Sequence, residues 1–149
     1  MIRRRHHNNQ EQRSGAALVE SALVLPIFFL VTLSVVEFGR AFMVSQLLTN
    51  SAREGARLAI TAGVTNQEVV DSVTDQVAST VGVSAAQVTV DITITPFTGN
   101  PDPGNDLTQA NKRDLCNVTT SVLYDDVSFV PMRFLAGVSL AGQAAMRHE

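Results

Sequence analysis

Glu20 is the residue whose chemistry most needs an explanation, because it is the one acid in an apolar run from Ala16 to Val36. An ionised carboxylate at the middle of a bilayer costs roughly 2.5–3.5 kcal/mol on insertion scales, so membrane-spanning segments avoid it. A cut between Gly15 and Ala16 would supply a partner, since the new ammonium group would lie four residues before Glu20 on one helical face. A cut at Gly15 and Ala16 would therefore give Glu20 a partner for a charge pair.

Candidate catalytic and metal-binding residues are sparse in the rest of the sequence. His6 and His7 fall in the basic N-terminal stretch and His148 lies at the other end, so we expect no histidine in the folded core. Asp125 and Asp126 are adjacent and project in different directions, which indicates a turn rather than paired acid–base chemistry. We therefore predict no enzymatic activity, no cofactor and no metal site.

A polar loop, TGNPDPGNDLTQANKRD, separates two expected strands and is long enough to be mobile or functional. Asp102, Asn105 and Asp106 offer oxygen ligands for Ca²⁺, but Pro103 and the lack of a bidentate glutamate break the usual loop pattern. We expect the 96–114 segment to be a mobile surface loop, and its contact with a partner stays open.

Cys116 is the only cysteine, which excludes an intramolecular disulfide. We expect it to pack as a small apolar residue in a strand. Pairing between two chains stays open as the alternative.

The run 16–36 is long enough to cross a bilayer once, since 21 helical residues span about 31 Å and the hydrocarbon core is roughly 30 Å thick. All arginines of residues 1–15 precede it, which favours a cytoplasmic N-terminus and an extracytoplasmic domain of residues 37–149. A secretory signal has a shorter apolar region that ends at a small-residue cleavage site, and the flank VEFGR does not fit one. An uncleaved anchor is the competing account.

Charge argues against nucleic acid as a partner. The full chain has a net charge of −3, and removal of residues 1–15 takes away four arginines and one glutamate, which leaves 7 basic and 13 acidic residues, a net of −6. Nucleic acid requires a clustered basic surface. We expect membrane and protein partners only.

Pro26 interrupts the apolar run and removes the hydrogen bond that its nitrogen would give to the carbonyl of Ala22. We expect a kink or a local loosening there, with a role in assembly. Ser21, Thr32 and Ser34 offer hydroxyl groups to the freed backbone or to a partner helix.

Beyond Val36 the apolar pattern continues as an amphipathic helix over residues 37–62. Thr65 to Glu68 predict a capping box that opens a second helix over 66–81. Alternation predicts strands at 88–95 and 117–124 within a sheet region of 86–147. The expected fold is α+β and pilin-like, with a leader of residues 1–15, a transmembrane helix of 16–36 and a small antiparallel sheet.

The run GAALVESALVLPIFFLVTLSVVEFGR, followed by AREGAR, resembles the TadE-like family. Members are pilin-like membrane proteins of the tight adherence (Tad) system, which assembles type IV pili of the Flp class. The resemblance covers the first third of the chain and also favours a third strand near Val138–Arg147. It implies a cut after Gly15 by a prepilin peptidase, since a glycine before the cut and a glutamate at the fifth mature position mark that class of signal.

The resemblance also implies a role for two groups of charged positions. Contacts with partner helices or with the assembly platform are implied at Glu37, Gly39, Arg40, Arg53, Glu54 and Arg57. The alternative is a solvated helical surface, on which Glu37 with Arg40 and Glu54 with Arg57 would pair across a turn.

The function that these observations predict is that of a minor pilin or pseudopilin in the bacterial inner membrane, with other pilin-like subunits as partners. In a bundle, Glu20 would pair with the Ala16 ammonium group of a neighbour, which would favour assembly and fix the axial register. Two alternatives stay open: a membrane-tethered binding module, and a minor pseudopilin of a type II secretion machine.

Overall fold

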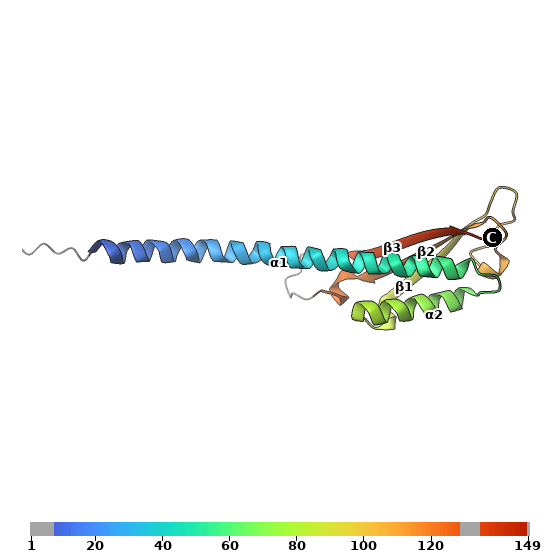
Figure 1. Cartoon of the computed structure of the whole chain (residues 1–149), viewed down its shortest axis with the longest axis horizontal. Helices are drawn as coiled ribbons and strands as arrows, with labels where there is room; N and C mark the ends of the chain where they lie inside the picture. The colour runs from blue at the N-terminus through green and yellow to red at the C-terminus, as the bar shows by residue number, and fades with distance from the viewer. Residues whose placement is uncertain (1–7, 129–134, 149) are drawn as a thin grey trace, which may run out of the picture. The chain divides into compact units, whose positions relative to one another are not determined.

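The computed structural model describes residues 8–128 and 135–148. Two helices precede three strands along the chain (Figure 1): α1 Asn8–Ala59, α2 Asn66–Val77, β1 Val88–Thr95, β2 Leu115–Leu123 and β3 Ser139–Arg147. The strands form one antiparallel sheet in the order β1-β2-β3. The predicted α+β fold with a long N-terminal helix and a three-stranded sheet is confirmed.

The chain divides after Val36 into two compact units. The first contains the apolar part of α1, whose large side chains are exposed, Leu23 and Ile27 among them. Within the described residues, one helical stretch, Gly15–Ala59, is long and apolar enough to cross a membrane. Within the described residues 8–36 of this unit, the expected membrane segment lies on α1, which is the single element there.

The second unit begins with residues 37–59 of α1, which bury one face. Val44, Leu48, Ala52 and Ala56 recur at four-residue steps and are all fully buried. This spacing places them on one side of the helix, where they meet apolar residues of α2 and of the sheet. Figure 1 shows α2 running alongside the last part of α1, with β3 on the other side of α1 in this view.

The capping box at the start of α2 is confirmed. The Thr65 hydroxyl accepts a hydrogen bond from Glu68 N, and the Glu68 carboxylate accepts from Thr65 N at 2.8 Å. These bonds from the Thr65 backbone and side chain lower the pKa of Glu68. The apolar face of α2, Val69, Val73 and Val77, is buried, and a π-helical turn at Ala78–Gly82 ends the segment.

Alternation along the strands correctly predicted the buried face of the sheet. In β2, Cys116, Val118, Thr120 and Val122 point inward, and Ile94 is the buried residue of β1. β3 forms although its sequence has poor β propensity, because Gly142 allows the strand to approach α1 closely. A Cβ atom at Gly142 would clash with the backbone of Leu48 and Thr49.

Several predicted boundaries differ from the structure. Helix α2 ends at Val77 and not at residue 81, and β2 spans Leu115–Leu123 and not 117–124. Helix α1 ends at Ala59, whereas the sequence predicted an end at residue 62. Turns that contain the bonds Thr61 N to Leu58 O and Val64 N to Thr61 O replace the last helical residues, and Gly63 adopts a φ of +82°. Glycine adopts this positive φ without strain, so Gly63 allows the chain to reverse at this point.

Candidate functional site: the faces of helix α1

The expected processing site lies within a helix. Because α1 begins at Asn8, residues 8–15 of the expected leader are helical up to the Gly15–Ala16 bond. Ala16 and Glu20 are exposed and stand one helical turn apart. The geometry therefore fits a charge pair between a new ammonium group at Ala16 and the Glu20 carboxylate.

The helix also continues through Pro26. The nearby hydroxyl groups bond within the helix, because Thr32 Oγ1 donates to Phe28 O and Ser34 Oγ donates to Leu30 O, both at 2.8 Å. Neither bond reaches the Ala22 carbonyl that Pro26 leaves without its usual donor. These hydroxyls are thus satisfied by their own helix and do not repair the backbone at Pro26.

Glu37, the first residue of the second unit, is buried inside its own domain. The Tyr124 hydroxyl donates to the Glu37 carboxylate and lies 3.1 Å from the Glu37 carbonyl oxygen. Burial, followed by the hydrogen bond and the charge of Glu37, raises the pKa of Tyr124 to about 12. Tyr124 therefore stays protonated and remains a donor to Glu37 at any physiological pH.

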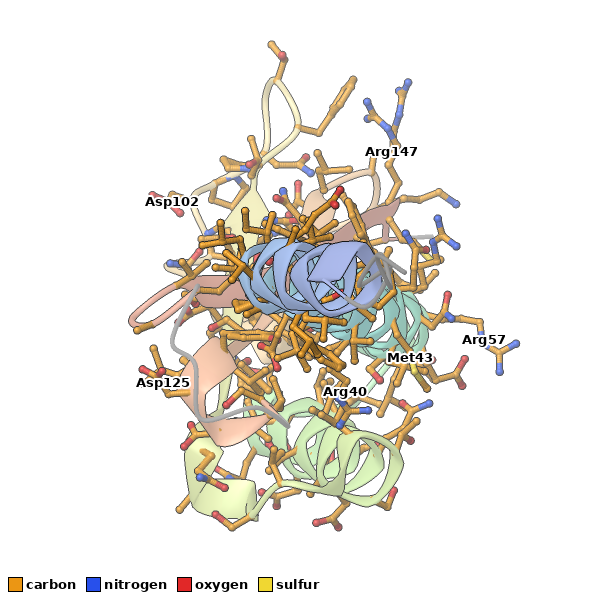
Figure 2. The ribbon with its side chains drawn as sticks, turned by 90° about the vertical axis from the view of Figure 1, so that its left-hand side faces the viewer. Arg40, Met43, Arg57, Asp102, Asp125 and Arg147 are labelled. Carbon is orange, nitrogen blue, oxygen red and sulfur yellow. The ribbon has the colours of Figure 1, made fainter. Side chains whose placement is uncertain are left out.

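Arg40 holds two other segments against the same end of the domain. Its Nε donates to Val127 O at 3.3 Å and its Nη2 donates to Val81 O at 3.2 Å. Figure 2 shows Arg40 between α1 and α2. Val81 lies in the π turn after α2 and Val127 caps the 3-10 turn after β2, so Arg40 joins these two turns.

The sequence placed Glu37 and Arg40 on an exposed helical surface as one alternative, and the structure corrects this exposure. Glu37 is only 1% exposed and Arg40 is half-buried, because elements distant in sequence fold over them. Gly39, between them, is exposed, and nothing lies within 4 Å of the position that its Cβ would take. Gly39 is thus the expected contact residue of this group that stays available to a partner.

The AREGAR segment has two faces with different uses. Its small residues face inward, where a Cβ at Gly55 would lie 2.5 Å from Val73 Cγ2 and would crowd α2. Its charged residues, Arg53, Glu54 and Arg57, face solvent, and Arg57 Nη2 pairs with Glu54 Oε1 at 3.1 Å. The expected Glu54–Arg57 pair is confirmed, and the three charged residues form an exposed surface.

The loop after β1 was expected to be a mobile surface loop. In the structure it is tied to the domain by hydrogen bonds and by a buried leucine. Leu107 is buried, Asn105 Oδ1 accepts a hydrogen bond from Ile94 N, and Asn66 Nδ2 donates to Asn105 O. Asp106 accepts from Thr108 N as the cap of a short 3-10 helix. Asp102 likewise accepts from Gly104 N, so all three residues considered as calcium ligands bond within the chain. The described residues contain no group of three or more His, Cys, Asp or Glu side chains placed for a metal.

Asp114 anchors the end of this loop and is fully buried. Its carboxylate accepts from Phe97 N, Asn100 Nδ2 and Asn111 N at 2.6–2.8 Å. Burial alone would raise the pKa of Asp114, but these three hydrogen bonds and the charge of His148 outweigh it and lower the pKa. The carboxylate is thus ionised and structural.

The start of β2 is bulged opposite His148. Arg113 N donates to His148 O at 2.7 Å, and His148 N donates to Asp114 O at 2.8 Å, so two residues oppose one. Arg113 takes a φ of +75°, a conformation in which glycine is usual. Its guanidinium group lies 4.1 Å from the centre of the Phe97 ring, which helps to hold this conformation. His148, expected outside the core, is thus tied to the sheet through its backbone.

Cys116 is fully buried in β2, as predicted. Burial raises the pKa of its thiol, and the charge of Asp114 raises it further. A thiol that is buried and protonated reacts slowly. This environment argues against pairing of Cys116 between chains.

Sequence reasoning missed Tyr124 and Asp114 as the residues that organise the domain. Tyr124 is the only tyrosine in the chain, and the predicted strand at 117–124 treated it as one of the apolar residues. A signal was present, since a buried tyrosine needs a hydrogen-bond partner, but Glu37 had been assigned only to Arg40 or to a partner helix. Asp114 ended a polar segment, and nothing in its local sequence distinguished it from solvated aspartates.

Comparison with known families locates the resemblance on α1. Residues 15–57 match the model of a family described as TadE-like protein. The match begins at Gly15 and ends at Arg57, so it includes the exposed apolar part of α1, the Glu37–Arg40 group and AREGAR. No curated protein and no solved structure matches the chain.

Proposed function

We propose that this protein is a minor pilin or pseudopilin of a Tad pilus system, anchored by α1 in the bacterial inner membrane. The match of residues 15–57 to TadE-like proteins carries this proposal, because that family consists of components of the Tad pilus. The N-terminus would be cytoplasmic and residues 37–149 extracytoplasmic, since the arginines precede the apolar segment.

The first step that we propose is removal of residues 1–15 by a prepilin peptidase. Gly15 and Glu20 have the spacing that this class of signal requires, and both lie on an exposed part of α1. Because residues 8–14 are helical in the full chain, the peptidase would have to unwind the helix around Gly15 to reach the peptide bond. A glycine at this position lowers the cost of unwinding by about 1 kcal/mol relative to alanine.

The second step is entry of α1 into a bundle of like helices. The exposed apolar side chains of residues 15–36 are stable in lipid or against other helices but not in water. The Glu20 carboxylate is costly in lipid alone, and pairing with the Ala16 ammonium group of a neighbour removes that cost. Pro26, Gly39 and the exposed charges of AREGAR would then contact neighbouring subunits or the assembly platform.

The test is the intact mass and N-terminal sequence of the membrane-extracted protein from cells with and without the prepilin peptidase. We expect a start at Ala16 that depends on the peptidase and is lost in a Gly15→Val variant. Gly39→Ala, an exposed glycine on the same helix, is the matched control and should be cut normally. A leader retained in cells that contain the peptidase would reject the pilin-type role and leave a tethered binding module.

Incorporation is measured separately from cleavage. Glu20→Ala should insert and be cut but should be depleted from sheared or affinity-purified pilus fractions. Normal incorporation of Glu20→Ala would contradict the proposed charge pair. Recovery of the wild-type chain with type II secretion components instead of pilus components would favour the other pseudopilin class.

A further inference from the structure

The exposed apolar side chains of the second unit gather at one of its ends. In its described residues, 37–128 and 135–148, the large apolar side chains that are exposed are Phe38, Phe42, Met43, Leu123 and Val138. Phe42 is the most exposed of them, at 71%. Single exposed apolar residues are ordinary on a protein surface, so it is their common position that needs an explanation.

The contact between Tyr124 and Glu37 fixes that position. Glu37 is the first residue of the second unit, and its carbonyl oxygen lies 3.1 Å from the Tyr124 hydroxyl. Tyr124 N donates to Val138 O at 2.8 Å, and Leu123 directly precedes Tyr124 at the end of β2. Leu123 and Val138 therefore lie at the end where α1 enters the domain, which is also where α1 carries its three exposed apolar residues. We call these five residues the apolar collar.

The charged residues of the same helical turns are directed toward the domain. Glu37 is buried, and Arg40 is half-buried and donates to two backbone carbonyls of the domain. Phe38 and Phe42 are one turn apart and are both exposed, so they share a face of α1. The first turns of α1 in this domain thus present an apolar surface, although their sequence contains two charges.

The height of the apolar collar fits the head-group region of a bilayer. A helix rises about 7.5 Å from Phe38 to Met43. The head-group region is about 5–8 Å thick on each side, because a bilayer measures about 40–45 Å in total and its hydrocarbon core about 30 Å. Phe38 follows the apolar run 16–36 by two residues. A helix that fills the hydrocarbon core with residues 16–36 therefore places its next turns in the head-group region.

We propose that the apolar collar docks this end of the domain into the head-group region of the bilayer that α1 crosses. This inference rests on the membrane anchoring in the proposed function and does not depend on cleavage or assembly. Aromatic and aliphatic side chains at the boundary of the hydrocarbon core leave water for the acyl chains, which stabilises the docked domain. Docking fixes the height of the domain above the membrane before it meets any protein partner.

The acids at this end determine the class of lipid. Asp125 and Asp126 are exposed, and their carboxylates accept hydrogen bonds from Gly137 N and Gln87 Nε2, respectively. Figure 2 shows Asp125 on the left and Met43 on the right, so this acid does not interrupt the helical part of the collar. Carboxylates stay hydrated among head groups, but anionic lipids repel them. The domain therefore docks on zwitterionic lipid in preference to anionic lipid.

The test measures the depth of single fluorescent probes on the full-length chain in phosphatidylcholine nanodiscs, with quenching by spin-labelled lipid. The probes are attached at Ser139→Cys, on the sheet side of the collar, at Asn50→Cys, further along α1, and at Leu23→Cys, in the apolar run. All three positions are exposed, and the native Cys116 is buried and does not take the label. We expect quenching at Ser139 to be about threefold stronger than at Asn50.

Removal of the aromatic groups tests the collar itself. Phe38→Ser with Phe42→Ser should lower the quenching at Ser139 about twofold or more, because the docked state loses its largest apolar groups. Quenching at Leu23 should not change, because α1 still crosses the bilayer. Protection of the Cys116 thiol identifies the variants that remain folded.

A matched control and a change of lipid make the test specific. Gln46→Ser with Gln143→Ser replaces two exposed side chains outside the collar and should leave the quenching at Ser139 unchanged. Replacing half of the phosphatidylcholine by phosphatidylglycerol should lower that quenching in the wild type. Asp125→Asn with Asp126→Asn should remove this dependence on lipid charge.

Several outcomes would overturn the proposal. Equal quenching at Ser139 and Asn50 in the folded chain would assign the collar to a protein partner instead of lipid. Unchanged quenching at Ser139 in the double serine variant would show that α1 alone sets the height of the domain, and stronger quenching in phosphatidylglycerol would contradict the role of the acids. Absence of quenching at Leu23 would instead reject the membrane anchoring and, with it, the proposed function.

Discussion

The two halves of α1 differ in how far they bury similar side chains. Leu23, in the first half, is 67% exposed, whereas Leu48, in the second, is fully buried. Both are leucines in an apolar helical stretch of one continuous element. The difference is that α2 and the sheet cover one face of the second half.

The two glutamates of this helix differ in the same way. Glu37 is buried and accepts a hydrogen bond from Tyr124, whereas Glu20 is exposed on the apolar half. The domain supplies the partner of one acid and not of the other. The second half of α1 is therefore covered by its own chain, whereas the apolar side chains of the first half stay exposed.

The largest effect is expected at the closest contact of the completed half. Gly142→Val would force side-chain atoms into the backbone of Leu48 and Thr49, so we expect a loss of more than about 3 kcal/mol in unfolding free energy. Denaturant titration of the full chain in detergent, followed by fluorescence of the single tyrosine, measures this. Gly39→Ala has open space at its Cβ and should instead be neutral or stabilising by about 0.5–1 kcal/mol; equal effects of both variants would contradict the packing.

Truncation of matched leucines compares the halves directly. Leu48→Ala should lower the unfolding free energy of the domain by about 2–5 kcal/mol, because it leaves a cavity between α1 and β2. Leu23→Ala should change it by less than about 0.5 kcal/mol. The same titration applies to both, and a comparable loss in Leu23→Ala would show that the apolar half is packed against the domain after all.

The glutamates allow a parallel comparison with a smaller effect. Glu37→Ala should destabilise the domain by about 1–3 kcal/mol, because it leaves the Tyr124 hydroxyl buried without its carboxylate acceptor. Glu20→Ala should leave domain stability unchanged. Adding Tyr124→Phe to Glu37→Ala should recover part of the loss, and a full additive loss in the double variant would argue against direct coupling.

The smallest effect concerns pH and lies wholly within the second unit. The pKa of Asp114 is lowered on folding, so its contribution to stability is present above the unfolded pKa near 4 and is lost as pH falls through the folded value. The difference in denaturant midpoint between wild type and Asp114→Asn should therefore be constant from pH 7 to about pH 5 and should shrink below about pH 4. A difference that grows on acidification would contradict this sign.

Local signals were sufficient to predict α2 and β1. Thr65 and Glu68 mark the start of α2 because both bonds of a capping box form within one turn. The alternation of apolar and polar residues from Val88 to Thr95 marks β1 for a similar reason, since the whole pattern lies within one short strand. β3 had no such signal and was expected from family resemblance alone.

The contacts around the site could not be predicted in the same way. Glu37 and Tyr124 are 87 residues apart, and Leu48 and Thr120 are 72 apart. Nothing local to Glu37 distinguishes a buried acid from an exposed one, because only the folded domain brings Tyr124 to it. Gly15 and Glu20 were accessible to sequence reasoning because their relationship depends on helical spacing alone.

The long sequence separation between the two residues of each contact also determines when the buried face of α1 is covered. The Thr120 hydroxyl that donates to Leu48 O, and the Tyr124 hydroxyl that donates to Glu37, are synthesised long after the helix itself. Contacts of this range make folding slow, because the intervening chain must be ordered first. A nascent chain would therefore expose the apolar face of residues 37–59 of α1 until β2 and β3 have been synthesised. During that interval a chaperone or the membrane surface would have to shield the helix, and premature pairing with other nascent chains would compete with folding.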